Sequence, residues 1–201
     1  SSIGAAPGLD TLEQLTSPVY VLAWTTTPWT LPSNLGLCVG PEIEYVAVRV
    51  DGASEVYVLA AERVAAIFKK QKVEELARFP GSALAGTTYE PLFPYFSGRA
   101  NCFQLLVDGF VTTGDGTGVV HLAPAYGEDD FRVCRAAGIE LVDPLDAEAK
   151  FTQLVPDYAG QFCKDADKPI IAALKSDGRL VHQDTIVHSY PFDDRTDTPL
   201  I

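Results

Sequence analysis

The feature that most constrains the fold of this sequence is a pair of strand-like runs joined by a turn signal. Residues Ile43 to Val50 and Glu55 to Ala61 are rich in valine, tyrosine and other strand formers. Asp51-Gly52 lies between them, and this dipeptide is the strongest short-range hairpin signal, although the four-residue gap also permits a bulged or longer turn. We therefore expect an antiparallel hairpin, so the chain has to build a sheet.

Further strands and helices are expected on both sides of this hairpin. Aliphatic and aromatic runs predict strands at Val19–Trp24, Phe103–Phe110, Val119–Leu122 and Arg179–Tyr190. Apolar stripes and terminal signals predict helices at Ala61–Phe79 with a break near Gln71, from about Asp129 to a stop at Gly138, and at Pro169–Asp177 between Asp167 and Gly178. This irregular alternation predicts an α+β fold, with a β-barrel-like core of mixed strands and peripheral helices.

The length of the chain favours a single domain. It has 201 residues, 47% of them hydrophobic, which is enough for one sizeable core. Residues 1–17 show little periodicity and are expected to be a flexible lead-in, residues 18–190 to be the domain, and residues 191–201 to be an extended exit strand.

Acidic residues outnumber basic ones by 27 to 15, which gives a formal net charge of −12. A protein that grips nucleic acid through its phosphates normally offers a basic face, so this chain alone should bind RNA poorly. Any nucleic-acid substrate would have to be delivered by another part of a larger protein, or be met only at a short single-stranded end.

The cysteines are far apart and include no C-x-x-C pair: Cys38, Cys102, Cys134 and Cys163. Free thiols in a reducing compartment are expected, and neither a zinc site nor a dense disulfide framework is indicated. No stretch approaches the roughly 20 apolar residues of a membrane-spanning helix, and the start lacks a basic region followed by an apolar run. These features predict a cytoplasmic protein without a membrane partner.

The segment W-T-T-T-P-W-T-L-P-S-N, from Trp24 to Asn34, concentrates polar groups at the end of the first expected strand. Pro28 favours an extended conformation of Thr27, and Pro32 fixes a second bend, so the threonine hydroxyls should stand on a rigid backbone. Rigid donors suit a small polar ligand. A threonine-rich strand end that merely caps a turn explains the segment equally well.

A second polar segment, G-T-G-V-V-H-L-A-P-A-Y-G-E-D-D, runs from Gly116 to Asp130. Its glycines permit another group to approach the backbone closely, His121 lies at the end of an expected strand, and its carboxylates lie at the start of an expected helix. The helix macrodipole should keep Asp130 ionised, so that it could bind an ammonium group. The alternative, slightly favoured for this segment taken alone, is that an aspartate caps the helix and His121 is a satisfied core residue.

Other motifs of catalysis or ligand binding are missing from the sequence. His182 and His188 would lie about 20 Å apart along a strand, too far for one metal site, so both are expected to be structural. Neither a G-x-S-x-G motif nor a P-loop occurs, and the glycine-rich run 114–118 has no lysine that could help to cradle a phosphate.

Together, the two polar segments resemble the threonine-rich peptide and the G-T-G-x-V-H-x-A-P-x-x-G-x-D-D block of the editing domain (CP1) inserted in isoleucyl-tRNA synthetase, a class I synthetase. The related valyl and leucyl enzymes fit less well, because they typically carry arginine in place of Thr27 and lack a histidine at His121. Likeness at 89–95, 160–178 and 188–201 extends the resemblance over most of the chain, toward the branch that includes eukaryotic cytosolic enzymes.

The resemblance implies an aminoacyl-tRNA deacylase with assigned residue roles. The hydroxyls and backbone of Thr25, Thr26 and Thr27 would hold the ester end and the attacking water. His121 would exclude isoleucine and contact the terminal adenosine, and Asp130 would bind the α-ammonium group. Further substrate-binding positions are expected at Trp29, Thr30, Asn34, Gly118, Val119 and Ala123.

The implied chemistry is ester hydrolysis without a metal or a cofactor. The vicinal ribose hydroxyl of the substrate can help to position water while the protein supplies orientation and electrostatics, and an imidazole base remains the alternative. A hydrophobic pocket separates isoleucine from valine by only about two orders of magnitude, for which isoleucyl-tRNA synthetase is the established example. A second pocket that refuses isoleucine by overpacking would add about 1–3 kcal/mol.

The resemblance thus implies hydrolysis of valyl-tRNA(Ile) and valyl-adenylate by a monomeric domain. Its partners would be the 3′ end of tRNA(Ile) carrying valine and the rest of a parent synthetase, which would supply the ATP site, because the H-I-G-H and K-M-S-K-S signatures are absent. Asp193-Asp194 replaces the usual Cys-Trp or Cys-Pro, a change that concerns docking to the parent and leaves the pocket untouched. A catalytically silent structural or tRNA-positioning insertion, and valyl-type editing of threonyl-tRNA(Val), stay open as alternatives.

Overall fold

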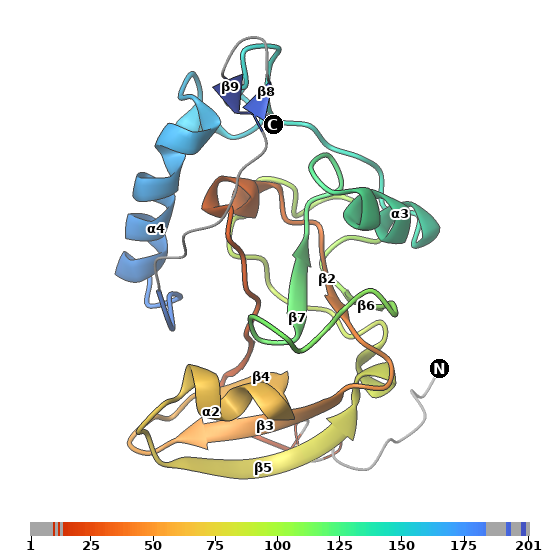
Figure 1. The fold of residues 1–201 in the computed structure, drawn as a ribbon, viewed down its shortest axis with the longest axis vertical. Coiled ribbons are helices and arrows are strands. Elements are labelled where there is room, and N and C mark those ends of the chain that lie inside the picture. Colours follow the sequence, from red (N-terminus) through yellow and green to blue (C-terminus); the bar gives the residue numbers. More distant parts are fainter. Residues whose placement is uncertain (1–9, 11, 13, 184–191, 194–197, 200–201) are drawn as a thin grey trace.

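The computed structural model describes residues 10, 12, 14–183, 192–193 and 198–199, which form two main sheets with helices around them (Figure 1). The larger sheet has the order β1-β4-β3-β5, with β1 (Val19–Val21), β3 (Glu44–Val50), β4 (Val56–Ala60) and β5 (Val73–Pro80). The smaller sheet has the order β6-β2-β7, with β2 (Gly36–Val39), β6 (Leu105–Val107) and β7 (Val119–Leu122). The α+β class is confirmed, but the described strands form two open sheets and do not close a barrel.

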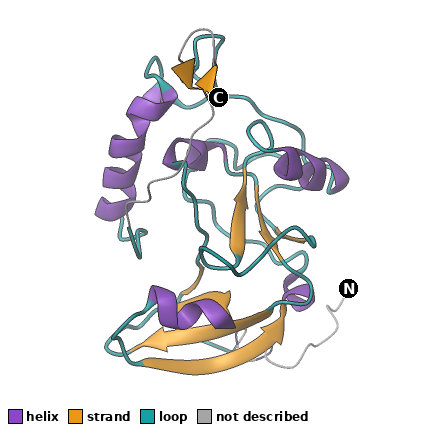
Figure 2. Cartoon of the chain, in the orientation of Figure 1, coloured by secondary structure: helices purple, strands orange, loops and turns teal. Residues whose placement is uncertain are grey.

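In the continuous described stretch 14–183, three α-helices and five 3-10 turns surround these sheets (Figure 2). The helices are α2 (Val64–Ile67), α3 (Glu128–Ala136) and α4 (Asp167–Ser176). The 3-10 turns are η1 (Pro28–Ser33), η2 (Ala61–Arg63), η3 (Gly81–Leu84), η4 (Pro156–Tyr158) and η5 (Cys163–Ala166). Gly138 and Gly178 follow α3 and α4 with φ of +72° and +68°, which confirms the stop signals read from the sequence.

The expected hairpin is confirmed. Strands β3 and β4 pair antiparallel, with Val48 opposite Tyr57, and Gly52 takes a φ of +84° in the turn. β4 continues into η2 and α2, and Val64 and Ile67 of α2 pack on one face of the larger sheet.

The expectation of helical structure from Ala61 to Phe79, with a break near Gln71, is wrong in its second half. Helical structure ends at Ile67, and after a turn the chain forms β5, which pairs antiparallel with β3. Ala77 and Phe79 are buried whereas Arg78 between them is exposed, the alternation of a strand on a half-buried sheet. Local helix propensity is overridden because this segment extends the sheet beyond β3.

Some other expected strands differ in length or burial. Val19 and Tyr20 are 38% and 42% exposed, so β1 is an edge strand and not a buried one. β6 occupies only the middle of the expected strand 103–110. Residues 179–183 are not a strand, and residues 184–190 of the same expected element lie outside the described residues. Near the end, β8 (Phe192–Asp193) and β9 (Thr198–Pro199) pair antiparallel.

The two main sheets meet at a close contact between β4 and the start of β7. Gly118 has a φ of +75°, and a Cβ atom at this position would lie 2.5 Å from the Cβ of Ala60. The buried hydroxyl of Tyr45 donates to the Gly118 carbonyl at 2.6 Å and accepts from the Gly40 amide at 2.9 Å. The second glycine of G-T-G is therefore required by backbone conformation and by sheet packing.

The four cysteines are free thiols, as expected. Burial raises the pKa of Cys38 and of Cys134 to about 12, so neither is a reactive thiolate at neutral pH. Within the described part of the chain, no helix combines the length and the apolar character that crossing a membrane requires.

Candidate functional site

The threonine-rich segment connects β1 to η1. Trp24 forms an isolated bridge with Val120 of β7, and Pro28 then occupies the first position of η1. The Thr25 hydroxyl accepts the Thr27 amide at 3.0 Å, and the hydroxyl oxygens of these two residues lie 3.3 Å apart. Local hydrogen bonds therefore fix the backbone and one hydroxyl of the segment.

His121, in β7, is buried against η1 and hydrogen-bonded through both ring nitrogens. Its Nε2 lies 2.8 Å from Thr30 Oγ1, and its Nδ1 lies 3.2 Å from Asn34 Nδ2. The same Asn34 nitrogen donates to the Gly36 carbonyl at 2.8 Å, while Asn34 Oδ1 accepts from the Tyr89 hydroxyl. Since the Gly36 carbonyl can only accept, it fixes the orientation of the amide, and the Tyr89 hydroxyl then donates to the amide oxygen.

This network determines the tautomer of His121. Because Asn34 Nδ2 can only donate, Nδ1 of the ring is the acceptor and Nε2 carries the hydrogen. Nε2–H then donates to Thr30, whose own hydroxyl donates to the Thr27 carbonyl at 2.8 Å. Burial lowers the pKa of His121 to about 4, so the ring is neutral at pH 7. With its lone pair engaged by Asn34, the ring is not free to act as a general base in this arrangement.

A cleft of about 860 Å³ lies beside this network. Four of the predicted site residues line it: Thr25, Thr26, Asn34 and His121. Ile67 of α2 and Leu174 of α4 both line the cleft, although the two helices lie in different parts of the fold (Figure 1). The structure thus brings the threonine-rich segment and the histidine to one cleft, although they are about 95 residues apart in the sequence.

The other predicted site residues do not line this cleft; they are Thr27, Trp29, Thr30, Gly118, Val119, Ala123 and Asp130. Thr27 and Thr30 belong to the hydrogen-bond chain behind His121. Trp29 is only 4% exposed and packs edge-on against Tyr126, with 4.8 Å between ring centres, so the structure gives it a packing position. Contacts of these residues with a substrate stay predictions.

Asp130 lies in the first turn of α3, as expected, but its carboxylate is turned toward the backbone. Oδ2 accepts the amide of Ala123 at 2.9 Å, so the side chain ties the start of α3 to the end of β7. Burial raises the pKa of Asp130 above its ordinary value, in the direction opposite to the helix-dipole effect inferred from the sequence. Its role as an ammonium anchor stays a prediction.

Sequence reasoning missed two residues that hold the site together. Tyr89 lines the cleft and fixes Asn34, and burial raises its pKa, so its hydroxyl stays protonated as a donor. Asp167, expected only near a helix cap, accepts the Trp29 amide at 2.8 Å and so joins α4 to η1. The partners of these residues are 55 and 138 positions away in the sequence, and no local sequence pattern predicts contacts over such separations.

Comparison with known proteins shows which family the chain belongs to. No protein-family model matches the chain. It is 54% identical over 185 residues to the isoleucine–tRNA ligase of Bdellovibrio bacteriovorus, covering 90% of this chain and 18% of that protein. It is 49% identical to the cytoplasmic isoleucine–tRNA ligase of Mus musculus, covering 90% of this chain and 15% of that protein. The chain is homologous to a segment of isoleucyl-tRNA synthetase.

The fold of this synthetase segment is that of an editing domain. It superposes on GlLeuRS-CP1 with a TM-score of 0.64 at 18% identity, over 91% of both chains. It superposes on the editing domain of P. falciparum cytosolic leucyl-tRNA synthetase with a TM-score of 0.61 at 13% identity, over 84% of this chain and 80% of that one. The resemblance read from the two polar segments is thereby confirmed.

The remaining histidines of this isoleucyl-tRNA synthetase segment lie near or beyond the limit of the described residues. His182 lines the cleft, whereas His188 lies outside the described part. In that described part, no group of three or more His, Cys, Asp or Glu side chains could hold a metal ion.

Proposed function

We propose that this chain is the editing domain of an isoleucyl-tRNA synthetase and hydrolyses the ester of valyl-tRNA(Ile), and also valyl-adenylate. The observation that carries the proposal is a neutral, orientated His121 beside the hydroxyls of Thr25 and Thr26 on one cleft. Homology to isoleucyl-tRNA synthetases and the editing-domain fold support the substrate class. The chain spans about 18% of the length of these relatives, so activation of isoleucine and most tRNA recognition are assigned to the rest of a cytoplasmic parent enzyme.

In the proposed reaction the protein positions the reactants and donates hydrogen bonds. Thr25 and Thr26 hold the ester and the attacking water, and the vicinal ribose hydroxyl helps to position that water. No proton is transferred to His121, because its one lone pair is engaged by Asn34 and its pKa is about 4. Asp130 binds the α-ammonium group after its carboxylate turns from Ala123, or through the oxygen that does not contact that amide.

Selection against isoleucine is assigned to the rigidity of His121. Its ring is held through both nitrogens and cannot move aside without breaking hydrogen bonds to Thr30 and Asn34. An extra methylene on the substrate would therefore meet an unyielding wall, at a cost of about 1–3 kcal/mol. That cost corresponds to a preference for valine of roughly 10- to 200-fold.

The test is deacylation by the 201-residue chain of three substrates: valyl-tRNA(Ile), isoleucyl-tRNA(Ile) and threonyl-tRNA(Val). We expect valine to be released at least about tenfold faster than isoleucine. Equal rates for valine and isoleucine would refute the steric sieve. Preferential release of threonine would indicate valyl-type editing, and a folded chain that releases none of them would be a silent insertion.

A further inference from the structure

Few cations of this acidic chain are free to meet an anionic partner. Among the described residues, five arginines form ion pairs with carboxylates. Arg63 donates to backbone carbonyls, including Gly116 at 2.7 Å, and Arg135 lies over the ring of Phe131. Lys150 pairs with Glu148, and Lys164 also has an interaction partner. The described lysines whose ammonium group forms no ion pair or hydrogen bond are Lys69, Lys70, Lys72, Lys168 and Lys175.

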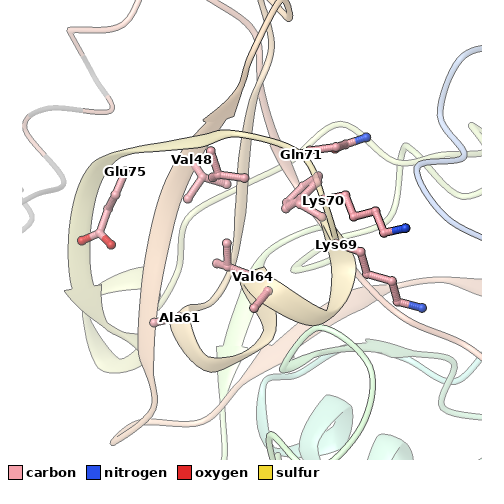
Figure 3. A pocket seen from close by; sticks show the side chains of 10 residues that line it. Val48, Ala61, Val64, Lys69, Lys70, Gln71 and Glu75 are labelled. Carbon is pink, nitrogen blue, oxygen red and sulfur yellow. The ribbon is translucent and has the colours of Figure 1, made fainter.

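Three of these five lysines share one turn. Residues 69–72, here called the lysine turn, join α2 to β5, and all four residues are exposed. Figure 3 shows Lys69 and Lys70 projecting together, with Glu75 on the other side of the small pocket that they line. The Glu75 carboxylate is paired with Arg78 at 2.8 Å. The backbone amide of Asp51 donates to the Lys72 carbonyl, so Asp51 lies next to the turn, but its carboxylate forms no ion pair with these lysines. No ion pair among the described residues neutralises the three ammonium groups of the turn.

The lysine turn follows a segment that contributes one residue to the wall of the cleft. Ile67, two residues before the turn, lines the cleft, whereas Val64 and Phe68 of the same segment line the small pocket of about 550 Å³. In Figure 1 the turn lies at the edge of the molecule, on the side where the chain leaves α4. An RNA strand whose end enters the cleft must leave over its rim, and phosphates are repelled by an acidic surface and attracted by unpaired lysines.

We propose that the lysine turn binds the phosphates of the single-stranded tRNA 3′ end whose aminoacyl ester enters the cleft. The inference rests on the proposed function and resolves the conflict between an RNA substrate and a net charge of −12. Only a short single strand has to be held, and a groove that tracks the backbone of such a strand does so through cations beside it.

The first test is the salt dependence of binding between the 201-residue chain and deacylated tRNA(Ile). Removal of two phosphate contacts by Lys69→Gln/Lys70→Gln should make the slope of log affinity against log salt shallower by about 1.4, at 0.7 per single-strand contact. Between 50 and 200 mM salt, the wild-type chain should then lose about sevenfold more affinity than the variant.

The matched control is Lys168→Gln/Lys175→Gln, which removes the same charge from the unpaired lysines of α4. It should leave the slope nearly unchanged. An equal change in both double variants would overturn the proposal, because overall charge and not the turn would then govern binding. A wild-type chain without salt-dependent binding would overturn it too.

A phosphate-free ester separates this proposal from the proposed function. Valyl-adenosine should be hydrolysed at the same rate by the wild type and by Lys69→Gln/Lys70→Gln, whereas kcat/KM for valyl-tRNA(Ile) should fall with the affinity. If neither ester is hydrolysed, the proposed function fails while the salt slopes still decide the binding role. If valyl-adenosine hydrolysis falls as much as tRNA deacylation, the lysines act on the pocket and the phosphate assignment is wrong.

Discussion

Replacing Tyr89 with phenylalanine removes one hydroxyl and keeps the ring that packs edge-on against Phe103 at 6.0 Å. The lost interaction is the hydrogen bond to Asn34 Oδ1. A hydrogen bond between neutral groups contributes about 1 kcal/mol net, and a buried carbonyl left without a donor costs about 1–3 kcal/mol. We therefore expect Tyr89→Phe to lower the free energy of unfolding by about 1–3 kcal/mol, measured by urea titration.

The decisive effect is expected on activity, because the Tyr89 hydroxyl holds the oxygen end of the Asn34 amide. Without its hydroxyl, only the Gly36 carbonyl opposes rotation of that amide, and a rotated amide would present oxygen to Nδ1 of His121. If the correct amide orientation loses about 1.4 kcal/mol of its stability over the rotated one, kcat/KM for deacylation of valyl-tRNA(Ile) should fall about tenfold. Nitrogen NMR shifts of the imidazole should show the Nε2–H tautomer in the wild type and a mixture in the variant.

Tyr95→Phe is the matched control for this experiment. It removes a hydroxyl that donates to the exposed Asp157 carboxylate at 2.6 Å, and Tyr95 does not line the cleft. It should leave deacylation and the His121 tautomer unchanged. If Tyr89→Phe folds and keeps wild-type deacylation with a pure Nε2–H tautomer, Tyr89 has no positioning role.

Three further perturbations test the site and its support. The pKa of His121 is lowered from 6.5 to about 4, so between pH 6.5 and pH 4 the unfolded chain binds a proton that the folded chain does not. The free energy of unfolding should therefore drop by about 3 kcal/mol as the pH falls through this range. His121→Gln should lose this part of the pH dependence of stability. Asp130→Asn can still accept the Ala123 amide but cannot pair with an ammonium group, so it should unfold like the wild type and deacylate at least about 100-fold more slowly; normal turnover would remove Asp130 from the site. Gly118→Ala combines a φ of +75° with overpacking against Ala60 and should destabilise the fold by about 2–4 kcal/mol in urea titration. In the double variant Gly118→Ala/Ala60→Gly, the second change should relieve only the overpacking, so stability should recover only in part. Full recovery of the free energy of unfolding would show that the backbone conformation at position 118 costs nothing.

Local signals in the sequence predicted the elements whose causes are local. The hairpin at Asp51-Gly52 and the helix stops at Gly138 and Gly178 depend on backbone conformations that glycine favours, and all three are observed. β5 could not be identified from helix propensity, because its structure depends on pairing with β3. Prediction therefore failed where a segment's structure is determined by a partner elsewhere in the chain.

The candidate site shows the same limit. Two motifs suffice to name Thr25, Thr26, Asn34 and His121, which meet at the cleft. They do not separate these residues from neighbours that support the fold. Gly118, for example, lies inside the second motif, yet its observed contact is with Ala60 of β4. A motif of this kind contains residues that line the cleft together with residues that pack the two segments against each other.

The tautomer of His121 is accordingly a property of the assembled fold and not of either motif. β2 pairs with β7 so that Leu37 lies opposite His121, and this register places Asn34, three residues before Leu37, against the ring. Tyr89 then fixes the amide from a third segment. A chain that kept both motifs but lacked a donor at position 89 would keep the cleft residues and lose part of their orientation. The proposed exclusion of isoleucine requires that orientation, because a side chain that can rotate aside would not exclude an extra methylene.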